Sequence, residues 1–307
     1  MKKILIAAGF GVLLFAGCKE IPPVINFGHE KVTDTTYVLS TIPSAQAHNV
    51  LVEEFTGESC SNCPAAHTLL DGIVAANPGR VNVVSLYENS TAPINVPPTG
   101  ANYDLRDSVA SEIAASTVYT TNQDANYGNL PGAGIDRVPV AAGTTTWLGS
   151  SQWSALISSR LSAPDSINLG ISSIYDTSSG IATITAMVTY VQAVSTSQNL
   201  TIEVVEDSII DFQEEPFGVI DTTYLFNDVL VGMVTAAPYG DPILDTMATK
   251  VAGRFFQRVY SYHLPAAFRK GIVYPAHCRV IGFINAPSGS NPDFRVMQSQ
   301  QTKLMGP

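Results

Sequence analysis

The chain has 307 residues and a mass of 32.6 kDa, which is more than one hydrophobic core usually serves, so we expect two domains. Hydrophobic residues make up 45% and charged residues 14% of the chain, a balance that excludes a largely disordered protein. A net charge of −10 leaves no electrostatic footprint for a phosphate backbone, so nucleic-acid binding is not expected. Four cysteines are too few for a small disulfide-stapled scaffold.

The N-terminus has the pattern of an export signal. Lys2 and Lys3 precede the apolar stretch 4–16, which is too short to span a bilayer as a helix but suits the apolar region of a signal peptide. The stretch leads into Phe-Ala-Gly-Cys, ending at Cys18, which resembles the lipobox of bacterial lipoproteins. The resemblance implies a signal peptide over 1–17, lipid attachment at Cys18, and an outer-membrane anchor facing the periplasm or the cell surface. The alternative is an ordinary signal peptide with a chance cysteine.

Residues 18–47 are polar and contain prolines, so we interpret them as a tether with one β-like stretch at 33–39. An Asp followed by Ser or Thr and then an aliphatic residue or Thr recurs along the chain and resembles the O-glycosylation sequon of Bacteroidetes. The alternative is that Asp-Ser and Asp-Thr pairs form turns and helix caps. The candidate acceptors are Thr35, Ser108, Ser166, Ser208, Thr222 and Thr246.

The segment 48–163 carries the pattern of a thioredoxin-like α/β domain. A strand-like run over 49–55 leads to Cys60-Ser-Asn-Cys63-Pro, and a helical pattern at 65–76 and a strand at 81–86 follow. Two residues between the cysteines bring both sulfurs to the first turn of a helix, within bonding reach. Unpaired N–H groups and the helix dipole favour a thiolate there. We expect Cys60 to be the more exposed, attacking sulfur and Cys63 to resolve the mixed disulfide.

Two further positions complete the predicted redox site. Glu54 lies six residues before Cys60, where thioredoxins carry a buried carboxylate that assists the second cysteine, so the resemblance implies a proton-relay role. The alternative is that Glu54 merely pairs with a polar neighbour. Leu130-Pro131 resembles the cis-proline loop that exposes backbone for an extended substrate, with Val138-Pro139 as the alternative. A helix from 103 to about 116 and a closing helix over 151–161 follow from apolar spacing.

The run VLVEEFTGESCSNCPAAH over 50–67, with NLPGAGIDR over 129–137, resembles a family of bacterial lipoproteins related to a 28-kDa outer membrane protein. The resemblance implies a thioredoxin-like domain followed by a C-terminal β domain in the cell envelope. Leu130, Gly132 and Ser59 depart from the residues common in that family at those positions. The family implies no settled biochemical activity.

Other readings of the motif compete with redox exchange. Cys60, Cys63 and His67 share a helix face, but zinc would need a fourth ligand, and copper handling would need a distal histidine that the sequence does not place. We therefore predict no metal and no cofactor. A static disulfide in a degenerate domain is the remaining alternative.

The segment 164–307 reads as an all-β sandwich of the immunoglobulin or fibronectin type. Alternating runs at 167–175 and 181–190 flank a turn, which indicates a hairpin, and further short runs follow. Residues 212–225 and 236–246 read as long loops. Cys278 beside His277 is interpreted as an inert buried thiol, because adjacent strand residues point to opposite faces.

Two functions follow from these patterns. The first is thiol–disulfide exchange with envelope or surface proteins, through a mixed disulfide and β-strand docking. The second is a surface binding or adhesion lipoprotein in which the CxxC is structural and the sandwich is the working part. Maleimide labelling with and without mild reductant separates the two.

We predict that Cys18→Ser leaves the chain unlipidated and absent from the membrane fraction, because no thiol remains to accept the diacylglycerol. Cell fractionation and labelling with a fatty-acid precursor measure this. A variant that stays with membranes and carries the label would show that Cys18 is not the attachment site.

Overall fold

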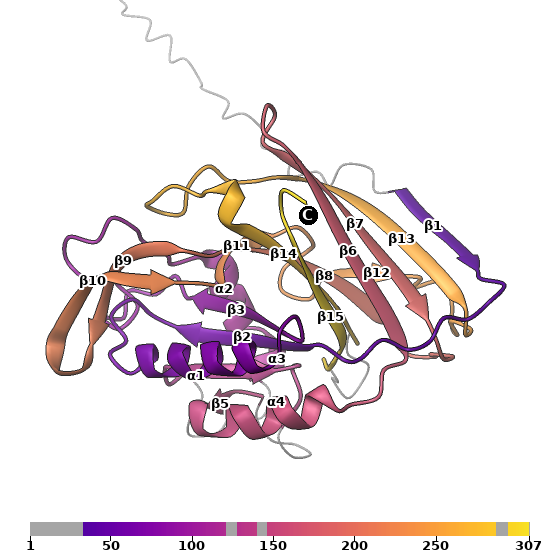
Figure 1. The fold of residues 1–307 in the computed structure, drawn as a ribbon, viewed down its shortest axis with the longest axis horizontal. Coiled ribbons are helices and arrows are strands. Elements are labelled where there is room, and N and C mark those ends of the chain that lie inside the picture. The colour runs from indigo at the N-terminus through magenta and orange to yellow at the C-terminus, as the bar shows by residue number, and fades with distance from the viewer. Residues whose placement is uncertain (1–32, 121–127, 140–145, 287–293, 307) are drawn as a thin grey trace, which may run out of the picture.

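The computed structural model describes residues 33–120, 128–139, 146–286 and 294–306. Strands make up most of the regular structure, and four helices accompany them in the described part (Figure 1). The helices are α1 (Cys63–Ala76), α2 (Ser108–Ala114), α3 (Thr117–Thr120) and α4 (Trp153–Leu161), with 3-10 turns η1 (Ser150–Gln152), η2 (Pro216–Gly218) and η3 (Pro275–His277). The strands are β1 (Thr33–Val38), β2 (Val50–Thr56), β3 (Val81–Tyr87), β4 (Gly132–Ile135), β5 (Leu148–Gly149), β6 (Ile167–Asp176), β7 (Ile181–Tyr190), β8 (Gln198–Glu206), β9 (Ile209–Glu215), β10 (Val219–Phe226), β11 (Val229–Met233), β12 (Asp241–Ile243), β13 (Arg254–His263), β14 (Cys278–Asn285) and β15 (Val296–Lys303).

A nine-stranded sheet runs through the molecule in the order β15-β14-β8-β11-β3-β2-β4-β5, with β12 paired to β8. Its β2 and β3 are parallel, as a strand–helix–strand unit requires, and β4 runs antiparallel to β2. All side chains of β2 and β3 are buried, because helices or strands cover both faces of this part of the sheet. The Val and Leu residues of these two strands suit a sheet that is buried on both faces.

The two faces of this sheet belong to different cores. Val50, Val52 and Val83 pack with α1 and α4 on one face. Leu51 and Phe55 pack with α2, α3 and strands of the C-terminal half on the other. Because β side chains alternate, consecutive residues of β2 enter different cores.

A second, antiparallel sheet has the order β1-β13-β7-β6. The apolar faces of β6, β7 and β13 pack against β8, β12 and β14 and enclose a third core, which makes this part a two-layer β arrangement. β1 pairs with β13 along its whole length. The Gln46 N–H donates to the Asn168 side-chain oxygen of β6, and the Asn168 side-chain amide donates to the Ser44 carbonyl. Residues 33–47, which the sequence assigns to a tether, therefore lie along the C-terminal half.

The segments 48–163 and 164–307 share one sheet. Val229 of β11 pairs in parallel with Ser85 of β3, whose N–H donates to the Asp228 carbonyl at 2.7 Å. Arg137 follows β4, and its guanidinium is fully buried and donates to both Glu53 oxygens, at 2.6 and 2.8 Å. The chain halves are thus joined by backbone pairing and by the contact of Arg137 with the Phe283 ring, whereas the Arg137–Glu53 ion pair lies within the N-terminal half.

The region 209–226 differs from the sequence prediction. The chain there forms the hairpin β9–β10, where we expected a long loop over 212–225. Its signal is present in the sequence: two alternating runs flank Pro-Phe-Gly at 216–218, a turn in which Phe217 and Gly218 adopt positive φ. Figure 1 shows the hairpin (orange) projecting at the end of the molecule where α1 begins.

We predict that Arg137→Met lowers the free energy of unfolding by about 3–5 kcal/mol, because it leaves the Glu53 carboxylate buried without its partner. The control is Arg269→Met, whose side chain is 51% exposed beside Asp104, and it should cost less than about 1 kcal/mol. Urea unfolding midpoints measure both. Equal midpoint shifts would show that the Arg137 pair does not carry this energy.

Candidate functional site

The CxxC motif lies where β2 gives way to α1. Cys60 and Cys63 form a disulfide with a Cα–Cα distance of 5.4 Å, and Cys63 is the first residue of the helix. The Cys63 N–H donates to the Cys60 carbonyl at 3.0 Å, and Pro64 occupies the first turn, where its missing N–H costs nothing. The helix N-terminus therefore directs its dipole at the sulfur pair.

Both sulfurs are closed to solvent, which corrects the expectation of an exposed Cys60. Cys60 is 1% exposed and Cys63 is 0% exposed. The hairpin β9–β10 supplies the cover: the buried side-chain amide of Gln213 donates to the carbonyls of Cys60 at 3.2 Å and Gly57 at 3.4 Å. The N–H of Glu214 donates to the Glu58 carbonyl at 2.9 Å. The physical reason for the correction is tertiary, since the hairpin comes from a segment more than 150 residues later.

The loop before Cys60 is held from a second side. Ser59 donates from its N–H to the Ile94 carbonyl and from its hydroxyl to the Val96 carbonyl, at 3.2 and 2.6 Å. A Cβ on Gly57 would lie 2.4 Å from the Ile94 carbonyl oxygen, so this close approach requires glycine. The Cys60 loop is consequently fixed between residues 94–96 and the hairpin.

The Leu130–Pro131 peptide bond is cis, as predicted, and the Val138–Pro139 alternative is not. Pro131 immediately precedes β4, whose Gly132 pairs with Phe55 near the end of β2. The cis bond therefore lies at the same end of the sheet as the disulfide. Leu130 and Pro131 are both half-buried. Their role in docking a substrate backbone stays a prediction.

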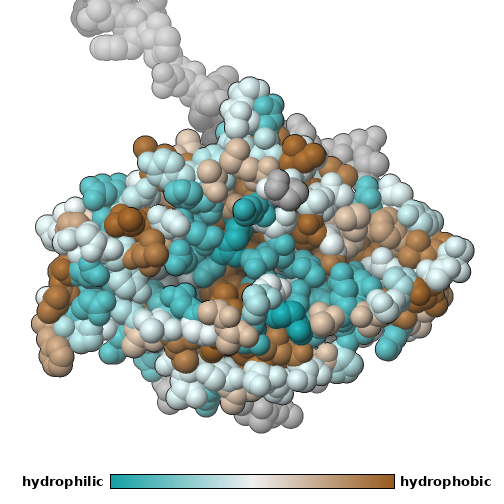
Figure 2. Space-filling model, viewed as in Figure 1, coloured by the Kyte–Doolittle hydropathy of each residue, from teal (hydrophilic) through white to brown (hydrophobic). Residues whose placement is uncertain are grey.

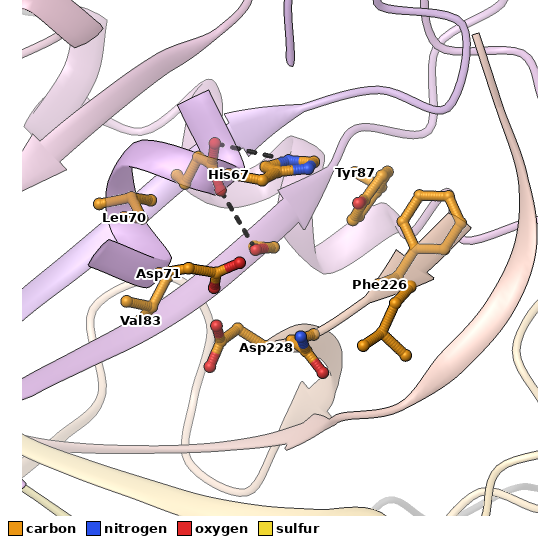
Figure 3. A pocket seen from close by; sticks show the side chains of 11 residues that line it. His67, Leu70, Asp71, Val83, Tyr87, Phe226 and Asp228 are labelled. Atoms are coloured by element: carbon orange, nitrogen blue, oxygen red, sulfur yellow. Dashed lines mark hydrogen bonds and ion pairs between the residues drawn. The ribbon is translucent and has the colours of Figure 1, made fainter. Parts of the chain in front are cut away.

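Glu54 faces the α1 side of the sheet and lines a small pocket with His67, Asp71 and Asp228 (Figure 3). Its carboxyl oxygens lie 3.4 Å from the Ser85 hydroxyl and 3.5 Å from His67 Nε2. The pocket volume of about 20 Å³ is room for roughly one water molecule.

The charges in this pocket are set by burial. Burial, with help from Asp228, raises the pKa of Glu54 well above its usual value, while burial lowers the pKa of His67 to about 4. Because His67 with this pKa is uncharged at neutral pH, its contact with Glu54 is not an ion pair. His67 Nδ1 lies 2.7 Å from the Tyr224 hydroxyl of the hairpin. Burial thus favours the protonated form of Glu54, and its relay role stays a prediction.

Glu58 is a second buried carboxyl, and it is one that the sequence analysis missed. One of its oxygens accepts from the Leu105 N–H at 3.1 Å, and the other has no hydrogen-bond partner among the described residues. Burial raises the pKa of Glu58 to about 8; the Leu105 N–H opposes this, while Asp104 and Asp211 contribute to it. A carboxyl two residues before Cys60 is a sequence signal, but its burial depends on the hairpin.

The candidate acceptor residues are dispersed over the molecule. Thr35, Ser108, Ser208, Thr222 and Thr246 are exposed, and Ser166 is half-buried. Five of the six preceding aspartates have structural partners. Asp107 caps α2, Asp165 accepts from the Ile167 N–H, and Asp221 accepts from the Thr223 N–H. Asp34 and Asp207 pair with Arg258 and Arg279. Turn and cap chemistry therefore accounts for part of the sequon pattern, and glycosylation stays a prediction.

Cys18 lies outside the described residues. Cys278 is buried in β14, and burial raises the pKa of its thiol. Within the ranges that the structure describes, no group of three or more His, Cys, Asp or Glu side chains is placed to hold a metal ion. No helix in those ranges is long and apolar enough to span a bilayer.

Comparison with known proteins finds similarity at the level of fold. No family model and no curated protein sequence matches the chain. Among solved structures, HBP35 of Porphyromonas gingivalis aligns over 85% of this chain and 77% of its own, with a TM-score of 0.62 and 13% identity. A structure from Agrobacterium tumefaciens aligns over 84% of this chain and 95% of its own, with a TM-score of 0.48 and 11% identity.

We predict that Glu58→Gln flattens the pH dependence of stability between pH 5 and 8. In that window the unfolded carboxyl loses its proton while the folded one, with a pKa of about 8, keeps it, so wild-type stability falls as pH rises. The difference in slope should reach at most about 1.4 kcal/mol per pH unit.

Urea midpoints at fixed pH values measure this slope. The matched control is Glu112→Gln on the exposed side of α2, which should leave the wild-type slope in place. Parallel profiles for Glu58→Gln and wild type would show that Glu58 ionises alike in both states.

Proposed function

We propose that the N-terminal half is a thioredoxin-like unit and that its Cys60–Cys63 pair exchanges disulfides with proteins of the cell envelope. The observation that carries this proposal is the disulfide at the start of α1, between parallel strands β2 and β3, with the cis bond of Pro131 at the same end of the sheet. The fold likeness to HBP35 spans most of the chain and supports one architecture for both halves. We further propose that the C-terminal sandwich is of the immunoglobulin or fibronectin type.

The exchange step needs only a partner dithiol. A partner thiolate attacks one sulfur of the Cys60–Cys63 disulfide, the S–S bond breaks, and the released sulfur takes up a proton. The partner's second thiolate then attacks the mixed disulfide, which leaves the partner oxidised and Cys60 and Cys63 reduced by two electrons. The reverse sequence, with Cys60 as nucleophile and Cys63 as resolving thiol, reduces a partner disulfide. Glu54, whose protonated form is favoured by burial, is the proposed proton donor in this scheme.

The proposed compartment is the outer membrane, with Cys18 lipidated and the chain facing the periplasm or the cell surface. Support comes from the N-terminal pattern and from the disulfide itself, since disulfides persist in oxidising compartments. We include membership of the lipoprotein family that the 50–67 motif resembles in this proposal. O-glycosylation at the exposed acceptors is consistent with the same compartment.

A second candidate function, protein binding at the cell surface with a structural disulfide, is favoured by one observation. The covered sulfurs coincide with an exposed apolar hairpin: Phe217 is fully exposed, and Ile210, Val219 and Leu225 are at least half exposed. Figure 2 shows apolar atoms gathered at the edge of the molecule that the hairpin occupies. Patches of this kind mark interaction sites.

We predict that the Cys60–Cys63 couple has a reduction potential between about −120 and −270 mV, the range of exchange proteins. Equilibration of the full chain in thiol redox buffers, followed by mass-tagged alkylation, measures it. In oxidising envelope extracts, Cys63→Ala should trap mixed disulfides through Cys60, and Cys60→Ala should trap few.

The double variant Cys60→Ala with Cys63→Ala is the control for thiol-independent capture. Both single variants should stay folded, because a four-residue ring constrains the unfolded chain little. A potential below about −300 mV, with no trapping by either variant, would transfer the function to the second candidate.

A further inference from the structure

β9 meets the Cys60 loop through one backbone hydrogen bond and through the side-chain amide of Gln213. Three carbonyls of one short stretch, those of Gly57, Glu58 and Cys60, accept hydrogen bonds from Gln213 and Glu214. Gln213 is 0% exposed, so these bonds exclude water from the loop. An extended polypeptide that reached the disulfide would find these same three acceptors.

The hairpin is held mainly at its base. Ile209 and Phe226 pack on Tyr87 and Leu105 in a small apolar cluster. The Asp211 carboxylate accepts from the Tyr103 N–H at 2.5 Å. These contacts fix the hairpin next to the site whether or not its outer half stays in place.

The outer half of the hairpin makes fewer contacts. Among the residues that the structure describes, β9 and β10 pair as strands with each other alone, as a separate two-stranded sheet. Beyond Gln213 and Glu214, the turn at 216–218 has no buried residue, and Val219 and Ile220 are exposed. A segment with so little buried area opens locally at a lower free energy than the core.

We propose that the β9 segment around Gln213 and Glu214 is an internal stand-in for an extended polypeptide substrate, and that the disulfide reacts only after this segment leaves the Gly57, Glu58 and Cys60 carbonyls. The identity of the substrate rests on the proposed exchange function. The covering of the disulfide by this segment does not rest on that function, because it determines how any reductant reaches the sulfurs.

The test is the rate at which dithiothreitol reduces Cys60–Cys63 in the folded full chain. Gln213→Ala removes the amide that donates to Gly57 and Cys60, so reduction should accelerate about tenfold, the equivalent of roughly one net hydrogen bond. The matched control is Gln192→Ala, an exposed glutamine distant in sequence from the hairpin, and it should match wild type. A Gln213→Ala rate equal to wild type overturns the proposal.

Low urea concentrations separate local opening from unfolding. If the hairpin alone opens, the reduction rate rises only slightly with urea, because little surface is exposed. A reduction rate that depends on urea as steeply as global unfolding does overturns the proposal. A wild-type disulfide that is reduced as fast as the disulfide of the free peptide 57–66 also overturns it.

A peptide added in trans tests the substrate class. Millimolar peptide IIDFQEE, the sequence of β9, should slow reduction of Gln213→Ala by refilling the carbonyl sites, and the peptide with alanine at its glutamine should not. Equal effects of the two peptides overturn the stand-in assignment. A reduction potential below about −300 mV, together with faster disulfide reduction in Gln213→Ala, would overturn the exchange function and still support the covering role of β9.

Discussion

The buried guanidinium of Arg137 is the interaction on which the architecture depends. It follows β4, is paired with Glu53 of β2, and lies 4.8 Å over the ring of Phe283 in β14. It therefore contacts both halves of the chain inside a shared core. Glu203 of β8 approaches the same cluster, and burial together with Glu53 raises its pKa to about 8. Such a cluster is costly to bury, so the two halves must close around it completely.

Closure on both faces explains the two consecutive glutamates of β2. Glu53 points to the shared core and is ionically paired, whereas Glu54 points to α1 and faces the pocket beside His67. Both are buried because this part of the sheet is covered on both faces, by α1 and α4 on the Glu54 side and by α2, α3 and strands of the C-terminal half on the Glu53 side. Glu53 is ion-paired inside the shared core, whereas Glu54 lines the pocket beside His67, where its relay role stays a prediction.

Local patterns predicted the parts of the fold whose contacts are near in sequence. The strand–CxxC–helix–strand order, the helix ending at Leu161 and the cis bond at Pro131 each depend on short-range spacing or on proline chemistry. The burial of Cys60 was not predictable in that way. It depends on Gln213, which lies 153 residues away, and no period in the sequence links the two.

The contacts of Gln213 and Glu214 with the Cys60 loop connect the C-terminal half to the candidate redox site of the N-terminal half. Gln213 and Glu214 reach the Cys60 loop only because β9 starts beside β8, which is fixed in the shared sheet through β11 and β3. The same hairpin carries Phe217 to its exposed tip. The strand that bonds to the Cys60 loop through Gln213 and Glu214 leads directly into that tip. Because one hairpin carries both the exposed apolar tip and the contacts to the Cys60 loop, the two candidate functions are compatible in one molecule.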